Sequence, residues 1–241
     1  MNLSAENISK SYDDKVAVDD ISFDINSGET IGILGPNGAG KTTLFYILAG
    51  LVKSDSGSVF LSGEDLSNKS ISERTSLGLS YLPQESSVFK GLTVEQNIYS
   101  ALEQRKDLNK NEKQKNLNEL LEEFNLHNFS KTLGIKLSGG ERRRTEIARS
   151  LASNPKFILL DEPFAGIDPI AVSDLKNTIN ILNDKDIGVL ISDHNVRDTM
   201  NICSKVLVVS RGKIIANGIP SDVAKDDLVK EVYLGQDFSA E

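Results

Sequence analysis

The chain has 241 residues, of which 39% are hydrophobic and 26% are charged, and its formal net charge is −8 at pH 7. It is long enough to bury a substantial core, as one large domain or as a domain with a compact insertion. The negative charge gives no electrostatic reason to expect nucleic-acid binding, and the single cysteine, Cys203, excludes an internal disulfide and a cysteine-based metal site.

The N-terminal part of the chain is expected to form short strands and turns. Strands are predicted at residues 3–8, 16–25, 30–34 and 58–61. A turn of Asn, Ser and Gly at residues 26–28 separates two of these strands. A helix is expected at residues 41–49.

The most informative segment lies between the third strand and this helix. It reads Gly-Pro-Asn-Gly-Ala-Gly-Lys-Thr at residues 35–42. Glycines let successive backbone N–H groups point into one concavity, and the helix start adds a partial positive charge. Lys41 supplies a full positive charge, and Thr42 can bind Mg²⁺ through its hydroxyl. The setting predicts a phosphate-binding loop and disfavours an ordinary glycine-rich turn.

Helical patterns dominate residues 94–152. Leucine and phenylalanine recur at helical spacing at Leu117, Leu120, Leu121 and Phe124, with Lys and Glu between them. Strands and helices alternate again after Pro155. The strands are predicted at residues 157–160, 187–192 and 206–210, and the helices at 169–182 and 195–203. Continuous apolar strands separated by helices imply an α/β fold with a mostly parallel sheet, interrupted by a helical insertion.

Two carboxylates follow the apolar strand at residues 157–160. The carboxyl ends of strands in an open α/β sheet face the ligand crevice, so Asp161 and Glu162 should lie beside the phosphates. Asp161 can hold Mg²⁺ through its water shell, and Glu162 can take a proton from an attacking water. Capping of the next turn would be the better interpretation if the phosphate loop were absent.

Leu-Ser-Gly-Gly-Glu occupies residues 137–141. Ser138 and Glu141 have the spacing of a capping box, which predicts a helix that runs through Arg149. Capping does not explain two consecutive glycines, because glycine weakens a helix start unless a backbone must approach something closely. The free N–H groups, the hydroxyl and the helix N-terminus predict a second phosphate-binding surface.

Several segments occur in the order and spacing of ATP-binding cassette ATPases. They are the phosphate loop, Gln84 after Ser-Tyr-Leu-Pro, the pentapeptide at 137–141, the pair Asp161 and Glu162, the run Gly166, Ile167 and Asp168, and His194. The resemblance covers essentially the whole chain. It implies a P-loop NTPase (RecA-like) core with a mostly parallel sheet, an antiparallel β subdomain and an inserted α-helical subdomain.

The same resemblance implies how one domain over residues 1–241 is divided. Residues 1–85 and 156–241 would form the core and the antiparallel β subdomain. Residues 86–155 would form the helical subdomain that carries the pentapeptide.

In that family two cassettes enclose two ATP molecules, each held by the phosphate loop of one chain and the Ser-Gly-Gly segment of the other. The resemblance therefore implies ATP and Mg²⁺ as cofactors. It assigns to ATP the residues Tyr12, Asn37, Gly38, Ala39, Gly40, Lys41, Thr42, Thr43, Ser138, Gly139 and Gly140. It assigns Thr42, Gln84 and Asp161 to the metal, and Glu162, His194 and Gln84 to catalysis.

Tyr12, Gln84 and His194 need separate comment on the roles that the resemblance implies. Tyr12 matches the aromatic that stacks on adenine, although an ordinary aromatic near a strand end is a serious alternative. Gln84 would touch Mg²⁺ or the attacking water and sense the partner. A lone histidine is usually structural, but the position of His194 after a strand favours a hydrogen bond to the γ-phosphate, whereas His127 keeps the structural interpretation.

Two segments depart from the commonest family pattern. Glu141 stands where Gln is frequent, and residues 164–168 replace a frequent Ser-Ala-Leu-Asp, yet the glycines and Asp168 are kept. Three consecutive arginines raise the question of nucleic-acid binding. Arg142, Arg143 and Arg144 spread over about 200° of a helix, so they form no basic stripe that could bind nucleic acid. A solvated or salt-bridged helix start is expected there.

Transporters of this family receive a helix of the membrane subunit in a groove near the Gln segment. Residues 86–92 would line it, with Phe89 as the candidate contact and core packing as the alternative. Residues 81–85, 137–144, 157–169 and 232–238 together resemble the ATPases of lipopolysaccharide export machines. That resemblance implies a homodimer below a pair of inner-membrane permease subunits. Branched-chain amino-acid importer ATPases are the alternative, and a soluble cassette ATPase is less favoured because the chain has no long coiled coil and no second cassette.

The sequence also bears on location. Its longest apolar stretch, residues 44–52, is about half the length needed to cross a bilayer. Residues 1–14 have no basic start followed by an apolar segment. We therefore expect a cytoplasmic protein, peripheral on the cytoplasmic face of the inner membrane, whose membrane association comes through protein partners only.

Overall fold

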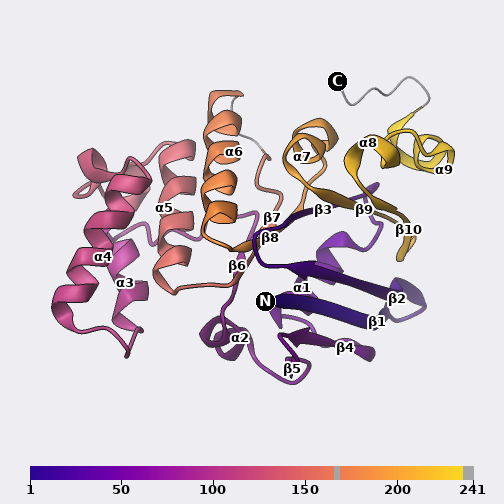
Figure 1. Cartoon of the computed structure of the whole chain (residues 1–241), viewed down its shortest axis with the longest axis horizontal. Helices are drawn as coiled ribbons and strands as arrows, with labels where there is room; N and C mark the ends of the chain where they lie inside the picture. The colour runs from indigo at the N-terminus through magenta and orange to yellow at the C-terminus, as the bar shows by residue number, and fades with distance from the viewer. Residues whose placement is uncertain (166–168, 236–241) are drawn as a thin grey trace.

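The computed structural model describes residues 1–165 and 169–235. Gly166, Ile167 and Asp168, and the last part of the segment 232–238, were singled out in the sequence and lie outside the described residues. Within the described residues, the strands form a 6-stranded sheet of order β10-β9-β3-β8-β7-β6 and a 4-stranded sheet of order β2-β1-β4-β5 (Figure 1).

The strands are β1 (Asn2–Tyr12), β2 (Lys15–Asn26), β3 (Thr30–Leu34), β4 (Ser56–Leu61), β5 (Glu64–Asp65), β6 (Leu79–Leu82), β7 (Phe157–Asp161), β8 (Gly188–Ser192), β9 (Lys205–Ser210) and β10 (Lys213–Gly218). The α-helices are α1 (Lys41–Ala49), α2 (Ile71–Leu77), α3 (Val94–Glu103), α4 (Lys110–Glu123), α5 (Gly139–Ala152), α6 (Pro169–Asp184), α7 (Val196–Ile202), α8 (Pro220–Val223) and α9 (Asp227–Val229).

The larger sheet is parallel except at one edge. β3 pairs parallel with β8 and β9, and β7 pairs parallel with β6 and β8, while β10 runs antiparallel to β9. Every residue of β3, β7 and β8 is buried, as expected for strands covered on both faces. The predicted α/β fold with a mostly parallel sheet is therefore confirmed.

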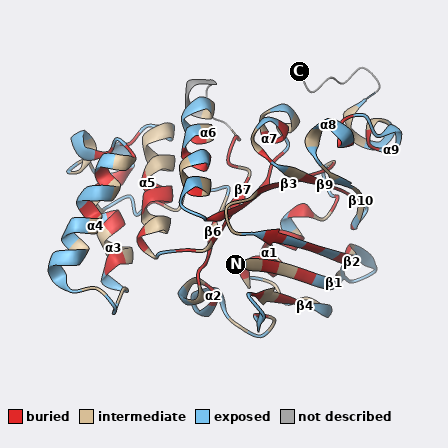
Figure 2. Cartoon of the chain, in the orientation of Figure 1, coloured by how far each residue is buried: buried red, intermediate tan, exposed pale blue. Residues whose placement is uncertain are grey.

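In the smaller sheet, β1 pairs antiparallel with β2 and β4, and β4 pairs antiparallel with β5. The strand expected at residues 3–8 extends from Asn2 to Tyr12, because β1 pairs with β2 as far as the hairpin between them. One buried cluster joins this sheet to the larger one through α1, whose Leu44 and Phe45 are fully buried (Figure 2). The helix that follows the phosphate loop is thus fixed between both sheets.

Helices α3, α4 and α5 gather at one end of the molecule, next to α6 (Figure 1). Their buried apolar side chains belong to one cluster with those of α6, α7 and the opposite face of the larger sheet. Among residues 1–165 and 169–235, no helix combines the length and the apolar character that a bilayer crossing requires.

Candidate nucleotide-binding site

The phosphate loop leaves β3 in a conformation that only glycine tolerates at its ends. Gly35 has φ 146°, and a Cβ there would lie 2.0 Å from the carbonyl oxygen of Val209. Gly40, which precedes α1, has φ 108°, and a Cβ there would lie 2.0 Å from the carbonyl oxygen of Ala17. The loop therefore packs against β9 and β2 so closely that a side chain at either glycine is excluded.

A cleft of about 250 Å³ opens over this loop. It is lined by Tyr12, Lys15, Ala17, Asn37, Gly38, Ala39, Gly40, Lys41, Thr42, Thr43 and Glu162. The structure thus brings the predicted aromatic, the predicted loop residues and one predicted catalytic residue to a single cleft. Tyr12 is 46% exposed, so its ring is accessible for stacking. The Lys10 ammonium lies over the ring, 5.5 Å from its centroid.

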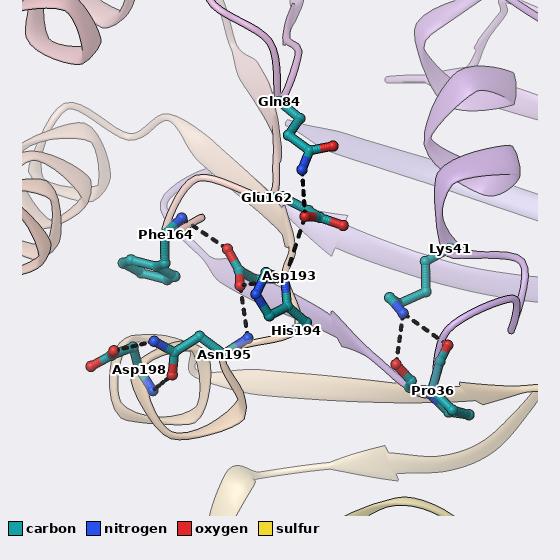
Figure 3. Close-up of polar contacts among 10 residues, drawn as sticks. Pro36, Lys41, Gln84, Glu162, Phe164, Asp193, His194, Asn195 and Asp198 are labelled. Carbon is teal, nitrogen blue, oxygen red and sulfur yellow. Dashed lines mark hydrogen bonds and ion pairs between the residues drawn. The ribbon is translucent and has the colours of Figure 1, made fainter. Parts of the chain in front are cut away.

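The environment of Lys41 shows whether the cleft suits a phosphate group. Its ammonium donates to the carbonyl oxygens of Gly35 at 2.6 Å and Pro36 at 3.1 Å (Figure 3). Burial lowers the pKa of Lys41, while the nearby charge of Glu162 acts in the opposite direction. A buried cation held by neutral carbonyls beside an open glycine cradle fits a polyphosphate, whose anionic oxygens are stronger acceptors.

Asp161 ends β7 and is only 4% exposed. Burial raises the pKa of its carboxyl, and a hydrogen bond from the Tyr81 hydroxyl to Oδ2, 3.1 Å long, opposes that rise. Glu162 follows with φ 43°, a left-handed conformation that costs a non-glycine residue about 1–2 kcal/mol. Its N–H donates to the Ser192 carbonyl oxygen at 2.6 Å, which holds the turn at the end of β8.

This turn aims the Glu162 carboxylate at Gln84 and His194 (Figure 3). Gln84 Nε2 donates to Glu162 Oε2 at 2.7 Å, and His194 Nδ1 lies 3.4 Å from the same oxygen. The structure therefore gathers the residues predicted to be catalytic around one carboxylate oxygen.

Asp193 holds the two sides of this cluster together, although the sequence did not single it out. It is fully buried, and its carboxylate accepts the backbone N–H groups of Phe164 at 2.8 Å and Asn195 at 2.7 Å. It thus ties the segment after Glu162 to the segment around His194. The sequence signal that could have identified Asp193 is its position directly after the buried strand β8.

Ser138, Gly139 and Gly140 lie elsewhere in the chain and do not line the cleft. The capping box is confirmed: Ser138 Oγ accepts the Glu141 N–H at 3.3 Å, and Glu141 Oε2 accepts the Ser138 N–H at 2.8 Å. Ser138 and Gly139 are exposed, and a Cβ at Gly139 would meet no atom within 4 Å beyond its chain neighbours and the backbone of its own helix. The helix start is therefore open on the side where a second chain could approach.

Comparison with known proteins identifies the family. The chain matches the ABC transporter family over residues 18–165. It belongs to this family. The chain is 53% identical to the lipopolysaccharide export system ATP-binding protein LptB of Haemophilus influenzae and 50% identical to LptB of Escherichia coli strain K12, and each match covers 98% of both chains.

The solved structures agree with this assignment. The ADP conformation of MJ1267, an ATP-binding cassette of an ABC transporter, is 31% identical, and the match covers 98% of this chain and 100% of that one with a TM-score of 0.86. The predicted P-loop NTPase fold is confirmed by this similarity.

The consecutive arginines of the cassette pair with carboxylates and a carbonyl. Arg143 Nη1 lies 3.2 Å from Glu146, Arg144 Nη1 lies 3.2 Å from Asp174, and Arg142 Nη2 donates to the Leu137 carbonyl oxygen at 2.9 Å. The salt-bridged helix start is confirmed, but the side chain of Arg143 is only 12% exposed, so it is not solvated.

Helix α5 also holds the segment after Gln84. Glu146 Oε1 accepts the Ser86 hydroxyl at 2.8 Å and the Ser87 N–H at 2.7 Å, and Arg149 Nη1 donates to the Ser87 carbonyl oxygen at 2.8 Å. The Arg149 guanidinium stacks over the ring of Phe89, 4.8 Å from its centroid. Phe89 is 51% exposed, so the core-packing alternative for this residue is wrong.

A second cleft, of about 490 Å³, lies between α3 and α4. It is lined by Leu92, Glu95, Gln96, Tyr99, Ser100, Glu103, Gln114, Leu117 and Lys131. Of the segment 86–92, Leu92 alone is among these residues, so Phe89 does not line this cleft.

The donors available for a metal are mostly not carboxylates. In the part of the chain that the structure describes, no group of three or more His, Cys, Asp or Glu side chains is arranged to hold a metal ion. The oxygen donors of Thr42, Gln84 and Asp161 suit Mg²⁺, which keeps several waters and is commonly bound through one or two carboxylates together with substrate phosphates.

Proposed function

We propose that this chain is the ATP-hydrolysing subunit of a transporter that extracts lipopolysaccharide from the inner membrane and exports it toward the outer membrane. The observation that carries ATP hydrolysis is the cluster of Glu162, Gln84 and His194 beside a glycine cradle with a buried lysine. The proposed cargo is supported by relatives named for lipopolysaccharide export that match nearly the full length at 50% identity or more. No observation favours the importer or the soluble ATPase.

We infer that ATP lies in the cleft over the phosphate loop, with its adenine on Tyr12 and its phosphates against residues 37–43. Lys41 would exchange the carbonyls of Gly35 and Pro36 for phosphate oxygens. Thr42, Gln84 and Asp161 would hold Mg²⁺, which neutralises charge on the phosphates when it is bound.

Phosphoryl transfer to water needs positioning and charge neutralisation more than covalent help. Glu162 would accept a proton from the attacking water, because its carboxylate projects from the turn into the cleft. Gln84 and His194 both meet Oε2, so they would fix which oxygen remains available to the water. His194 would also reach the γ-phosphate.

A shared site is proposed for the homodimer. Ser138, Gly139 and Gly140 would complete the site of the other chain, since they do not line their own chain's cleft. The exposed N-terminus of α5 supplies N–H groups and a partial positive charge for that purpose. The open space at Gly139 leaves room for a phosphate to approach the backbone.

We further propose that residues 1–85 and 156–241 form the core with the antiparallel β subdomain, and residues 86–155 the helical subdomain. The grouping of α3, α4 and α5 at one end of the molecule supports this division (Figure 1). Inner-membrane permease subunits would dock at Phe89 on the cytoplasmic face. The bonds from Glu146 and Arg149 would pass their force to the helix that begins with Ser138.

Co-purification tests the proposed task. The tagged chain is purified from gently solubilised native membranes, and its partners are identified by mass spectrometry. Recovery of lipopolysaccharide-export permeases is expected. Recovery of amino-acid permeases, or of no membrane protein, would contradict the proposal.

A further inference from the structure

The end of β6 contacts the end of β7 through two side-chain hydrogen bonds. Tyr81 donates its hydroxyl to Asp161 Oδ2 at 3.1 Å, and Gln84 donates its amide to Glu162 Oε2 at 2.7 Å. The second bond joins residues already assigned to the site. The first brings in Tyr81, which is not among the residues assigned to the nucleotide, the metal or catalysis.

The parallel pairing of β6 with β7 produces this contact. Tyr81 stands opposite Leu159 in the register, and Leu159 and Asp161 share one face of β7 because side chains alternate along a strand. That face belongs to the cluster around α1, against which Tyr81 also packs. The phenol therefore reaches along the sheet to the carboxylate two residues beyond its partner.

The ring of Tyr81 is itself fixed. The ring of Tyr46, on α1, meets it edge to face at 87°, with 6.3 Å between the centroids. A carboxylate oxygen can only accept, so the Tyr81 hydroxyl is the donor in this bond. Asp161 Oδ2 is thus occupied by a rigid donor.

We propose that Tyr81 is a positioning residue for the metal: it fixes the Asp161 carboxylate so that Oδ1 faces Mg²⁺ before the ion arrives. This inference rests on the proposed role of Asp161 as a metal-holding residue. The outer partners of metal-binding carboxylates orient them in the same way, and their loss costs about 10–100-fold in metal affinity or activity.

The location of Tyr81 gives the bond a second consequence. Tyr81 lies on the strand that leads directly into Leu82, Pro83 and Gln84. A displacement of the Gln84 segment would therefore move the donor of Asp161 together with the partner of Glu162. Metal affinity and the position of the catalytic carboxylate would then change together.

The test is Tyr81→Phe, which removes the hydroxyl and keeps the ring against Tyr46. Binding of Mn²⁺ to the full chain with a non-hydrolysable ATP analogue is measured by electron paramagnetic resonance. Nucleotide affinity is measured separately in EDTA. We expect the apparent Mn²⁺ affinity to fall about tenfold, with the nucleotide affinity in EDTA unchanged.

Matched variants separate the possible outcomes. Tyr46→Phe removes a neighbouring hydroxyl that does not contact Asp161, and it should leave Mn²⁺ affinity unchanged. If Asp161→Asn weakens Mn²⁺ binding and Tyr81→Phe does not, the inference on Tyr81 is overturned while the proposed site stands. If Asp161→Asn also leaves Mn²⁺ affinity unchanged, the proposed metal role fails. A parallel loss of nucleotide affinity in EDTA for Tyr81→Phe would show ordinary packing and overturn the inference.

Discussion

Gln84 Nε2 and Glu162 Oε2 lie 2.7 Å apart, which joins the loop after β6 to the turn after β7. The same oxygen lies 3.4 Å from His194 Nδ1. One carboxylate oxygen is therefore shared by residues from separate strand ends, and the other remains to contact a water. This arrangement makes the charge of Glu162 the feature to test first.

Glu162→Gln should nearly abolish turnover and trap an ATP-bound dimer. A glutamine keeps the size of the side chain but cannot accept the proton of the attacking water, and general-base catalysis contributes about 10²–10⁴-fold. Phosphate release gives the rate, and light scattering with ATP gives the dimer.

Glu85→Gln provides a matched control for this substitution. Glu85 is exposed, is next to Gln84 in the chain and does not line the cleft, so its neutralisation should leave the rate unchanged. A normal rate of ATP hydrolysis by the Glu162 variant would contradict the assignment of Glu162 as the general base.

Mixing two inactive variants should restore activity if the site is shared between chains. Lys41→Ala disables a phosphate loop, and Gly139→Asp places a negative charge where the partner's phosphates would lie. A mixed dimer keeps one intact site, so an equal mixture should reach about a quarter of the wild-type rate. The rate of the wild-type chain should also rise with protein concentration.

Gly139→Asp is suited to this test because it should not disturb its own chain. A side chain there meets open space, and an acidic residue in the first turn favours a helix start. Its melting temperature should therefore match that of the wild type. Failure of the mixture to recover activity, although both chains are folded, would reject the shared site.

Lys41→Met should separate nucleotide binding from folding. Burial lowers the pKa of Lys41, so its charged form is disfavoured in the folded chain. Replacing the lysine should therefore lower the melting temperature measured without nucleotide by no more than about 2–4 °C. The wild type should gain about 5–10 °C at a Mg·ATP concentration near a hundred times Kd, and the variant should gain nothing.

Lys53→Met controls for the loss of a lysine. Lys53 bonds Asn68 at 2.9 Å, does not line the cleft, and should keep the full nucleotide shift when replaced. A full shift in the Lys41 variant would mean that nucleotide binds without this lysine.

The parts of the fold that were predictable are those in which local sequence and burial agree. The strands β3, β7 and β8 are buried on both faces, so their residues are continuously apolar. The phosphate loop was predictable because Gly35 and Gly40 meet backbone that leaves no room for a Cβ. The roles of the individual site residues remain predictions.

Contacts between strands distant in sequence were not predictable in the same way. The bond from Tyr81 to Asp161 depends on β6 lying beside β7, and periodicity does not reveal which strands pair. Arg143 was expected in a solvated or salt-bridged helix start, and its burial follows from the packing of α5. Tertiary packing decided both.

Phe89→Ala should weaken assembly with membrane subunits and leave the ATPase activity of the isolated chain intact. The ring is half exposed, and its contact with Arg149 is worth about 0.5–1 kcal/mol at such a site, so folding should change little. Co-purification from membranes measures assembly. Ile219→Ala, which truncates a residue of similar exposure at the start of α8, should not affect it. Equal loss of assembly and isolated activity in the Phe89 variant would instead place the residue in the structural support of Gln84.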